Sequence, residues 1–211
     1  MSDTLEEAVC SYDELDFIRM SEEEIGPGQL GCFGAQARIW SAREALIFLE
    51  EGKGSWIIGT PFVTCTTAII HWEGERKLLS ISDRNFGLYG NMHLSPGQSY
   101  RVDRGMLVDK ALSAPDTRTI PWHRSWHPDL WMNEGYHRLA NGILGEQALP
   151  FHVEQRMSIV PYGKSRPADL ARDQAEIRMV SISSGQYPST KYIFSLGDLG
   201  ARGYAGGVKK R

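Results

Sequence analysis

The strongest constraint on the fold of this chain is a set of β-rich runs around one short polar turn. Residues 55–59, 62–72 and 76–82 are rich in Trp, Ile, Val and Thr, which favour extended strands. Residues 73–75 read Glu-Gly-Glu and fit the tip of a β-hairpin between the last two runs. The sequence therefore predicts an antiparallel hairpin over residues 62–82.

Local signals predict helices in three other places. Apolar residues recur with helical spacing over residues 35–51. Thr4 followed by Glu7 has the spacing of a capping box and predicts one or two short acidic helices within residues 2–24. Pro167 suits a first helical position and predicts a helix that runs to about residue 177.

Further strands are predicted at residues 155–160, 178–183 and 190–196, whereas residues 84–120 read as irregular because Asn, Gly, Pro and Ser recur there. Strands and helices mix without the strict alternation of a doubly wound fold. Neither the GxxxxGK[ST] phosphate-binding loop nor a GxSxG motif occurs. We therefore predict a single α+β domain over residues 1–211, with a mostly antiparallel sheet and two or three helices.

Charge is distributed unevenly along a chain whose net charge is −3. The acidic N-terminal segment, residues 1–25, holds nine acids against one arginine, whereas residues 163–211 hold nine basic residues against four acids. These ends are either two solvated surfaces or contact surfaces for another copy or a partner. The glycine-rich basic tail, residues 197–211, is predicted to be flexible unless another subunit holds it. Its three final basic residues are too few to indicate nucleic acid.

The three cysteines, Cys10, Cys32 and Cys65, exclude a disulfide framework because their number is odd and their spacings are wide. The sequence has no CxxC pair, which also excludes a four-cysteine zinc site. This usage predicts a reducing intracellular compartment such as the cytoplasm. Cys65 has β-branched neighbours and is expected to be a small buried hydrophobic side chain. No run of 18 or more apolar residues occurs, and we expect a soluble protein without a membrane-spanning helix.

Tryptophan and histidine gather in residues 121–137, which hold three of the six residues of each type. Trp, Tyr and Arg are the residue types that dominate the energetics of protein interfaces. The simplest alternative is an aromatic satellite of the core whose polar tips reach water. The candidate interface residues are Trp122, Arg124, Trp126, Trp131, Tyr136 and Arg138.

The same stretch also offers ligands for a zinc or iron ion. His123 and His127 are four residues apart, a spacing that places two imidazoles on one face of a helix. Pro128 argues against this arrangement because it disfavours helical geometry at His127. The candidate metal ligands are His123, His127, His137 and His152.

Cys32 stands just before the helix predicted over residues 35–51, where the helix dipole stabilises a thiolate. Gln29 is a candidate donor to an oxyanion hole. Downstream, a strand, a hairpin and a second strand end in Asp83-Arg-Asn-Phe-Gly. These segments resemble the second half of papain-like cysteine proteases and deamidases of the bacterial effector type. The resemblance implies a nucleophile at Cys32 and an orienting acid at Asp83.

Thr67 occupies the position at which this resemblance places the catalytic histidine. His71 does not replace it in the predicted hairpin. Paired residue numbers there sum to about 149, so that His71 faces Leu78 and Thr66 faces Asp83. His71 and Asp83 would then lie roughly 17 Å apart, at about 3.4 Å per strand residue.

The sequence therefore favours a non-catalytic interaction or assembly subunit. In this interpretation the aromatic stretch and the charged ends bind a protein partner or another copy. One alternative is a metal-dependent enzyme that uses the histidines of residues 123–152. Another is a papain-like cysteine hydrolase or deamidase that uses Cys32. Both alternatives remain open at this stage.

Overall fold

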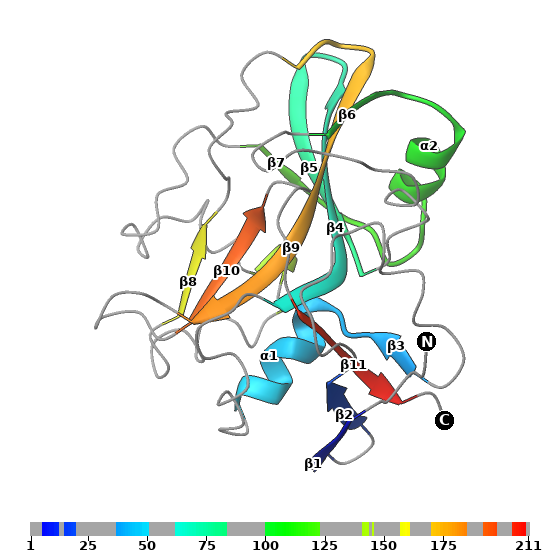
Figure 1. The fold of residues 1–211 in the computed structure, drawn as a ribbon. Helices are drawn as coiled ribbons and strands as arrows, with labels where there is room; N and C mark the ends of the chain where they lie inside the picture. Colours follow the sequence, from blue (N-terminus) through cyan, green and yellow to red (C-terminus); the bar gives the residue numbers. More distant parts are fainter. Residues whose placement is uncertain are drawn as a thin grey trace.

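The computed structural model describes residues 6–12, 15–19, 37–50, 62–83, 100–122, 141–143, 145, 157–160, 170–184, 192–197 and 204–209. A mixed sheet of 11 strands dominates these residues, together with two helices and a short helical piece at residues 141–143 (Figure 1). Eight of the ten strand pairings are antiparallel and two are parallel. The α+β class is therefore confirmed at this coarse level.

Two long neighbouring strands, β4 (Phe62–Glu73) and β9 (Gln174–Ser184), form the centre of the sheet. On its other side β9 pairs first with β6 (Tyr100–Asp103) and then with β10 (Tyr192–Gly197). Strand β5 (Arg76–Ser82) pairs with β4. The outer strands of this part are β7 (Arg118–Pro121) beside β5 and β8 (Met157–Val160) beside β10.

The hairpin of β4 and β5 has the predicted register. Its pairs run from Thr67 opposite Ser82 to Glu73 opposite Arg76, and His71 faces Leu78. Gly74 at the tip has φ of +56°, a left-handed conformation that favours glycine. Because this pairing needs only one tight turn, its register follows from the sequence alone.

The glycine-rich basic tail contains an internal strand of the sheet, β11 (Tyr204–Lys209), so the prediction of a flexible tail is wrong for these residues. One edge of β11 pairs with β2 (Leu15–Arg19) and the other with β3 (Ala37–Ile39). Its first two residues, Tyr204 and Ala205, run parallel to the start of β4. The chain's own strands therefore hold this segment, and no second subunit is needed for its order.

The acidic N-terminal segment forms strands where helices were predicted. Strand β1 (Glu6–Tyr12) pairs antiparallel with β2, and the register shifts between Glu7 and Cys10. The capping-box spacing at Thr4 and Glu7 is only a local signal. It is overridden because β1 pairs with β2, and β2 in turn pairs with β11, which is distant in sequence.

Helix α1 (Ala42–Glu50) begins later than the predicted start at residue 35. The Glu44 amide donates to Ser41 Oγ at 3.2 Å, and the Ser41 amide donates to Glu44 Oε2 at 2.9 Å. This reciprocal pair is a capping box, which fixes the first turn of the helix. Residues 37–39 consequently belong to β3, although their apolar spacing continues that of the helix.

Two other predictions fail because tertiary pairing outweighs local propensity. Residues 174–177 belong to β9, so the helix predicted from Pro167 to about residue 177 is wrong there. The stretch predicted as irregular contains β6, β7 and helix α2 (Met106–Leu112). The strands predicted at residues 155–160, 178–183 and 190–196 appear as β8, β9 and β10. The run at residues 55–59 lies outside the described residues.

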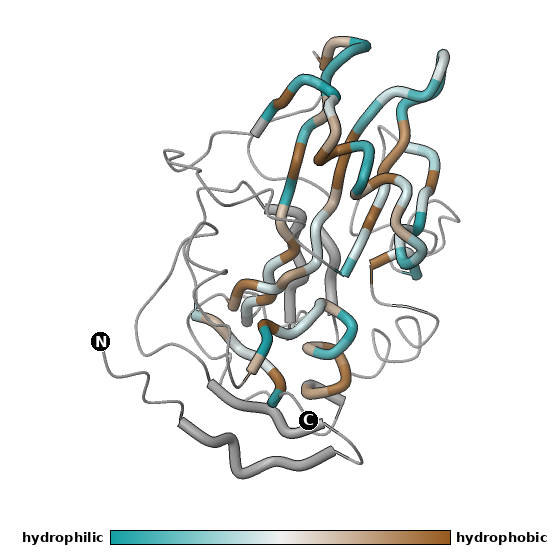
Figure 2. Tube along the Cα trace, turned by 90° about the vertical axis from the view of Figure 1, so that its right-hand side faces the viewer, coloured by the Kyte–Doolittle hydropathy of each residue, from teal (hydrophilic) through white to brown (hydrophobic). Residues whose placement is uncertain are grey.

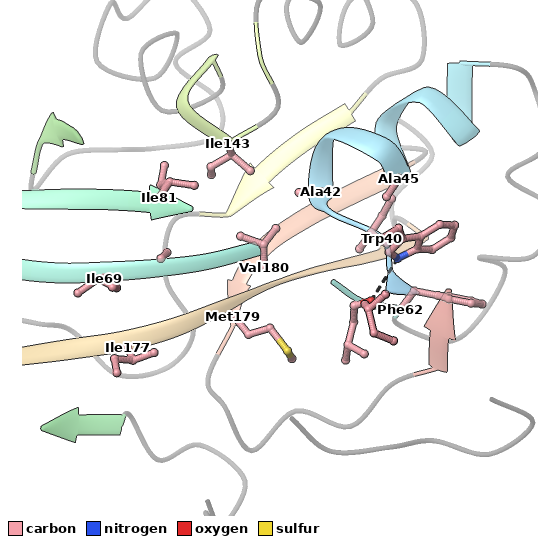
Figure 3. Packing of buried hydrophobic residues seen from close by; sticks show 14 of the residues in the cluster. Trp40, Ala42, Ala45, Phe62, Ile69, Ile81, Ile143, Ile177, Met179 and Val180 are labelled. Carbon is pink, nitrogen blue, oxygen red and sulfur yellow. Dashed lines mark hydrogen bonds between the residues drawn. The ribbon is translucent and has the colours of Figure 1, made fainter. Parts of the chain in front are cut away.

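Hydrophobic side chains are buried on both faces of the central strands. Val180 projects from β9 towards α1, whereas Ile177 and Met179 project to the opposite side (Figure 3). All three side chains are fully buried. Figure 2 shows that hydrophobic colours lie along the middle of the long strands and hydrophilic colours gather at their turns. The sheet is therefore covered on both sides in its central part.

Trp40 connects β3, β4, β11 and α1. Its amide donates to Gly206 O at 3.1 Å, and its carbonyl accepts from the Cys65 amide at 2.9 Å. Its indole Nε1 donates to Val63 O at 3.2 Å (Figure 3). The ring is completely buried, and its centroid lies 5.3 Å from that of Phe48. One side chain therefore satisfies its only polar group and packs against the helix at the same time.

Gly206 has no room for a side chain, and Gly206→Ala tests this packing. A Cβ atom there would lie 2.5 Å from Trp40 Cε2 and Cη2. We expect the substitution to lower the free energy of unfolding by about 1–3 kcal/mol, the usual cost of overpacking. Urea denaturation measures this change.

Gly105→Ala is the matched control, because a Cβ there meets only Asp103 O, at 3.9 Å. Its expected effect is below about 1 kcal/mol. Equal stability of the wild type and the Gly206→Ala variant would contradict the close contact with Trp40.

Candidate functional site around Asp83

Asp83 directly follows β5 and lies beside the first part of β4. Thr66 Oγ1 donates to Asp83 Oδ1 at 2.9 Å, as the predicted register requires. Cys65 Sγ donates to the main-chain oxygen of Asp83 at 3.1 Å. The side chain of Asp83 is only partly exposed. Its carboxylate therefore lies at the boundary between the sheet interior and solvent.

Thr66, which faces Asp83, belongs to an irregular stretch of β4. The register with β9 shifts between Val63 and Thr67, so the three residues between them leave the regular ladder. Thr64 Oγ1 donates to Val180 O at 2.6 Å, and Thr66 Oγ1 accepts from the Ala42 amide at 2.8 Å. The threonines thus bond to main-chain groups around the irregularity and connect Asp83 to the first turn of α1.

Two arginines face the Asp83 carboxylate from different elements. Arg118 of β7 donates from Nη1 to Oδ2 at 3.0 Å and from Nη2 to Oδ1 at 3.4 Å. Arg118 Nε also donates to Gly142 O at 2.7 Å. Arg43 of α1 lies farther away, with Nε 3.8 Å from Asp83 Oδ2. The carboxylate is therefore held in a two-point ion pair with Arg118 and shares its charge with Arg43.

Cys65 is a thiol rather than a nucleophilic thiolate. Burial, the largest cause, and the charges of Glu44 and Asp83 together raise the pKa of Cys65 to about 12. The side chain packs against the hydrophobic core, as the sequence predicts for a cysteine among β-branched residues, although part of it stays accessible. It acts here as a small side chain that donates one weak hydrogen bond.

The papain-like pattern brings no histidine to Asp83 within the described part of the chain. Thr67, which stands at the family's histidine position, is fully buried opposite Ser82. His71 is paired four residues farther along β4 and points to different partners. Cys32 and Gln29 lie outside the described residues. The catalytic roles suggested for Cys32, Gln29 and Asp83 stay predictions.

A hydroxyl–imidazole chain, which sequence patterns did not reveal, crosses three strands and is buried at two of its three members. His71 Nε2 lies 2.9 Å from Ser80 Oγ, which in turn lies 2.7 Å from Thr119 Oγ1. His71 and Ser80 are 6% and 2% exposed, and Thr119 is exposed. A serine next to a histidine is the start of a catalytic dyad, but the burial of Ser80 leaves no approach for an acyl substrate. The arrangement suits a structural polar network inside the sheet.

A buried ion pair on β9 was also missed, because a helix was predicted at its start. Glu176 and Arg178 stand two residues apart and share one face of the strand. Arg178 donates to Glu176 Oε1 from Nε at 2.8 Å and from Nη2 at 2.5 Å. Arg101 of β6 lies opposite, 3.5 Å from Glu176 Oε2. Glu176 and Arg178 are completely buried, so the opposite charge of each one stabilises the charged form of the other.

Trp122 of the candidate interface belongs to a row that extends across the sheet. Trp72 faces Lys77, and the amide of Trp122 donates to Lys77 O at 2.9 Å. The ammonium of Lys77 lies 4.8 Å from the centre of the Trp72 ring, and the guanidinium carbon of Arg172 lies 4.3 Å from it. We call Trp72, Lys77 and Trp122 the tryptophan–lysine row; all three side chains are half-buried.

The other members of the candidate interface and all four candidate metal ligands lie outside the described residues. They are Arg124, Trp126, Trp131, Tyr136 and Arg138, and His123, His127, His137 and His152. Within the described ranges, no group of three or more His, Cys, Asp or Glu side chains is placed to hold a metal ion. None of the helices in the described residues is long and apolar enough to cross a membrane.

Cys65 is expected to resist alkylation in the folded protein. A pKa of about 12 in place of 9.0 lowers the thiolate fraction at neutral pH roughly a thousandfold. Iodoacetamide labelling followed by peptide mass spectrometry resolves Cys65 from the other cysteines. The control is the same reaction in urea, where Cys65 is exposed. Equal labelling rates with and without urea would rule out the protected thiol.

The stability of the protein is expected to fall in mild acid because of His71. Burial lowers the pKa of His71 below its ordinary value of 6.5, and the charge of Arg104 lowers it further. As the pH falls below 6.5, the unfolded chain therefore binds more protons at this residue than the native protein does. The contribution of His71 to the free energy of unfolding is complete above pH 6.5 and decreases as the pH falls below it.

The test is urea denaturation between pH 5 and pH 8 for the wild type and His71→Gln. The free energy of unfolding of the wild type is expected to fall relative to that of His71→Gln below about pH 6.5. Ser80→Ala is the control, because it removes the hydrogen bond of Nε2 and keeps the titrating ring. Parallel profiles for the wild type and His71→Gln would show that His71 does not cause the acid dependence.

Comparison with known proteins adds no assignment to this geometry. No family model, no curated protein and no solved structure matches the chain.

Proposed function

We propose that this chain is a non-catalytic interaction or assembly subunit that binds a protein partner at the tryptophan–lysine row. The observation that carries this proposal is the row itself, in which the half-buried Trp72 and Trp122 stand on either side of Lys77 and two cations lie over the Trp72 ring. Tryptophan and arginine side chains contribute most of the energy at protein interfaces. The row also adjoins the aromatic stretch that starts at Trp122 and extends to Arg138.

The surroundings of Trp72 favour a pre-formed contact surface. Trp72 Nε1 donates to Leu170 O at 2.9 Å, and Arg104 Nη1 donates to the Trp72 carbonyl at 3.2 Å. Arg172 stacks on the ring, donates to Gly74 O and forms an ion pair with Glu75 at 3.2 Å. These contacts restrain the ring before any partner arrives, which lowers the entropy lost on binding.

The charged termini support the proposal less than the sequence suggested. Val208 pairs with Phe17, and Gly206 pairs with Arg19, so the basic tail and the acidic segment meet within one chain. Their opposite charges do not require a second copy. The two enzyme alternatives depend on Cys32 and on the histidines of residues 123–152, and they stay predictions.

Trp122→Ala tests the row without removing the hydrogen bond from Trp72 to Leu170. Native mass spectrometry of the untagged protein is expected to show an oligomer or a complex with a protein partner. A hot-spot tryptophan contributes about 2 kcal/mol or more, so the variant is expected to bind roughly 30-fold more weakly. The proportion of free monomer in a dilution series measures this change.

Met106→Ala is the matched control, because Met106 is 84% exposed on α2 and lies outside the row. It is expected to leave the complex intact. The proposal fails if the wild type stays monomeric without a bound protein at high concentration. It also fails if Trp122→Ala and Met106→Ala bind alike.

A further inference from the structure

The first turn of α1 carries a cation where an anion is expected. The positive end of a helix dipole favours acidic residues in the first turn, and Glu44 fits this preference. Arg43 precedes it as the second residue of the helix. Arg43 therefore adds positive charge to the end of the helix that is already positive.

The neighbouring carboxylate does not satisfy Arg43. Both oxygens of Asp83 accept hydrogen bonds from Arg118, and one accepts from Thr66 as well. Arg43 Nε is 3.8 Å from Asp83 Oδ2, beyond hydrogen-bond distance. This Nε atom is buried and has no hydrogen-bond partner among the described residues.

The remaining carboxylates near this site are also engaged. Asp116 accepts from Ser82 Oγ at 3.0 Å through Oδ2. Glu44 accepts from Arg38 Nη1 at 2.7 Å and from the Ser41 amide. Two guanidinium groups, those of Arg43 and Arg118, thus share the one carboxylate of Asp83. Arg43 Nε is therefore among the buried polar atoms of the described residues that have no hydrogen-bond partner.

Arg43 is also accessible to a ligand. Its side chain is 38% exposed, although its Nε is buried. Gly145, whose φ of +86° favours glycine, passes beside the guanidinium without a side chain. Burial lowers the pKa of Arg43, and the charge of Arg118 lowers it further, against the opposing effect of Asp83. A bound anion would offset the cost of this partly desolvated cation.

We propose that Arg43, backed by Arg118 and the first turn of α1, binds a small oxyanion group, either a phosphate or a carboxylate. Because Nε is buried, the ligand is expected to meet the two Nη groups of the planar guanidinium, whose parallel N–H donors match two oxygens of such a group. The helix dipole adds to the attraction. This site is separate from the tryptophan–lysine row and does not depend on the proposed protein-binding function.

The experiment measures anion binding to the full chain by thermal unfolding and by the arginine Nε–H signals in ¹⁵N-correlated NMR spectra. Inorganic phosphate and acetate are titrated separately, and sodium chloride keeps the ionic strength constant. A saturable rise in Tm and a shift of the Arg43 Nε–H signal are expected with at least one of the two anions. The anion that binds more tightly shows which class of ligand the site prefers.

Arg43→Gln is expected to weaken this binding at least about tenfold, because a charge-assisted hydrogen bond contributes about 1.5–3 kcal/mol. Arg43→Lys keeps the charge and loses the two-pronged donor, so intermediate affinity is expected. Arg38→Gln is the matched control: Arg38 is exposed, and its guanidinium is paired with Glu44.

Two results would overturn the proposal. One is the absence of any saturable response to either anion at constant ionic strength. The other is equal anion affinity in the wild type and in a folded Arg43→Gln variant. Thermal unfolding without added anion shows whether each variant is folded, so loss of structure is not mistaken for loss of binding.

Discussion

The sheet has two parts: one is formed by β1, β2, β3 and β11, and the other is centred on β4 and β9. The contact between Trp40 and Gly206 joins these two parts. Strand β11 meets β4 through only two residue pairs, after which it continues between β2 and β3. Trp40 reinforces this narrow junction by bonding to the carbonyl oxygens of Gly206 and Val63. Its ring covers Gly206 so closely that only glycine fits. The glycine content of the tail predicted flexibility, yet Gly206 is the residue that permits the close packing of this strand against Trp40.

Asp83 owes its environment to the same junction. Strand β4 changes partner from β11 to β5 between Val63 and Thr67, and the intervening threonines bond to groups outside the ladder. This irregularity brings the first turn of α1 next to the end of β5. The result is one carboxylate facing two arginines, of which Arg43 is left short of partners. A departure from regular pairing thus creates the polar site.

Local patterns predicted the parts of the fold that depend on nearby residues. The β4–β5 hairpin and its register follow from strand propensity on both sides of Gly74. The end of α1 was predicted within one residue, but its start was missed because the Ser41–Glu44 capping box was not recognised. That signal was present in the sequence, as Ser followed three residues later by Glu. The single-domain prediction and the roles of the candidate site residues stay predictions.

The rest depended on contacts between distant residues. Nothing near residues 174–177 signals a strand strongly, yet all four residues pair with β6 and residues 175–177 also pair with β4. The contact of Arg101 with Glu176, and of Arg118 with Asp83, likewise joins segments far apart in sequence. No local sequence pattern predicts these contacts between distant residues, because they form only when several strands join one sheet.

Local sequence patterns were enough to predict the α+β class, the central hairpin with its register, and the residue types available for a site. Each of these depends on propensity or on a short turn, whose energy is local. Long-range pairing, in contrast, is the reason that β1, β2 and β11 join the sheet, that Glu176 and Arg178 are buried as a pair, and that Asp83 faces two arginines. The physical reason is that backbone groups and charges must find partners when water is removed, and the partners available were distant in sequence.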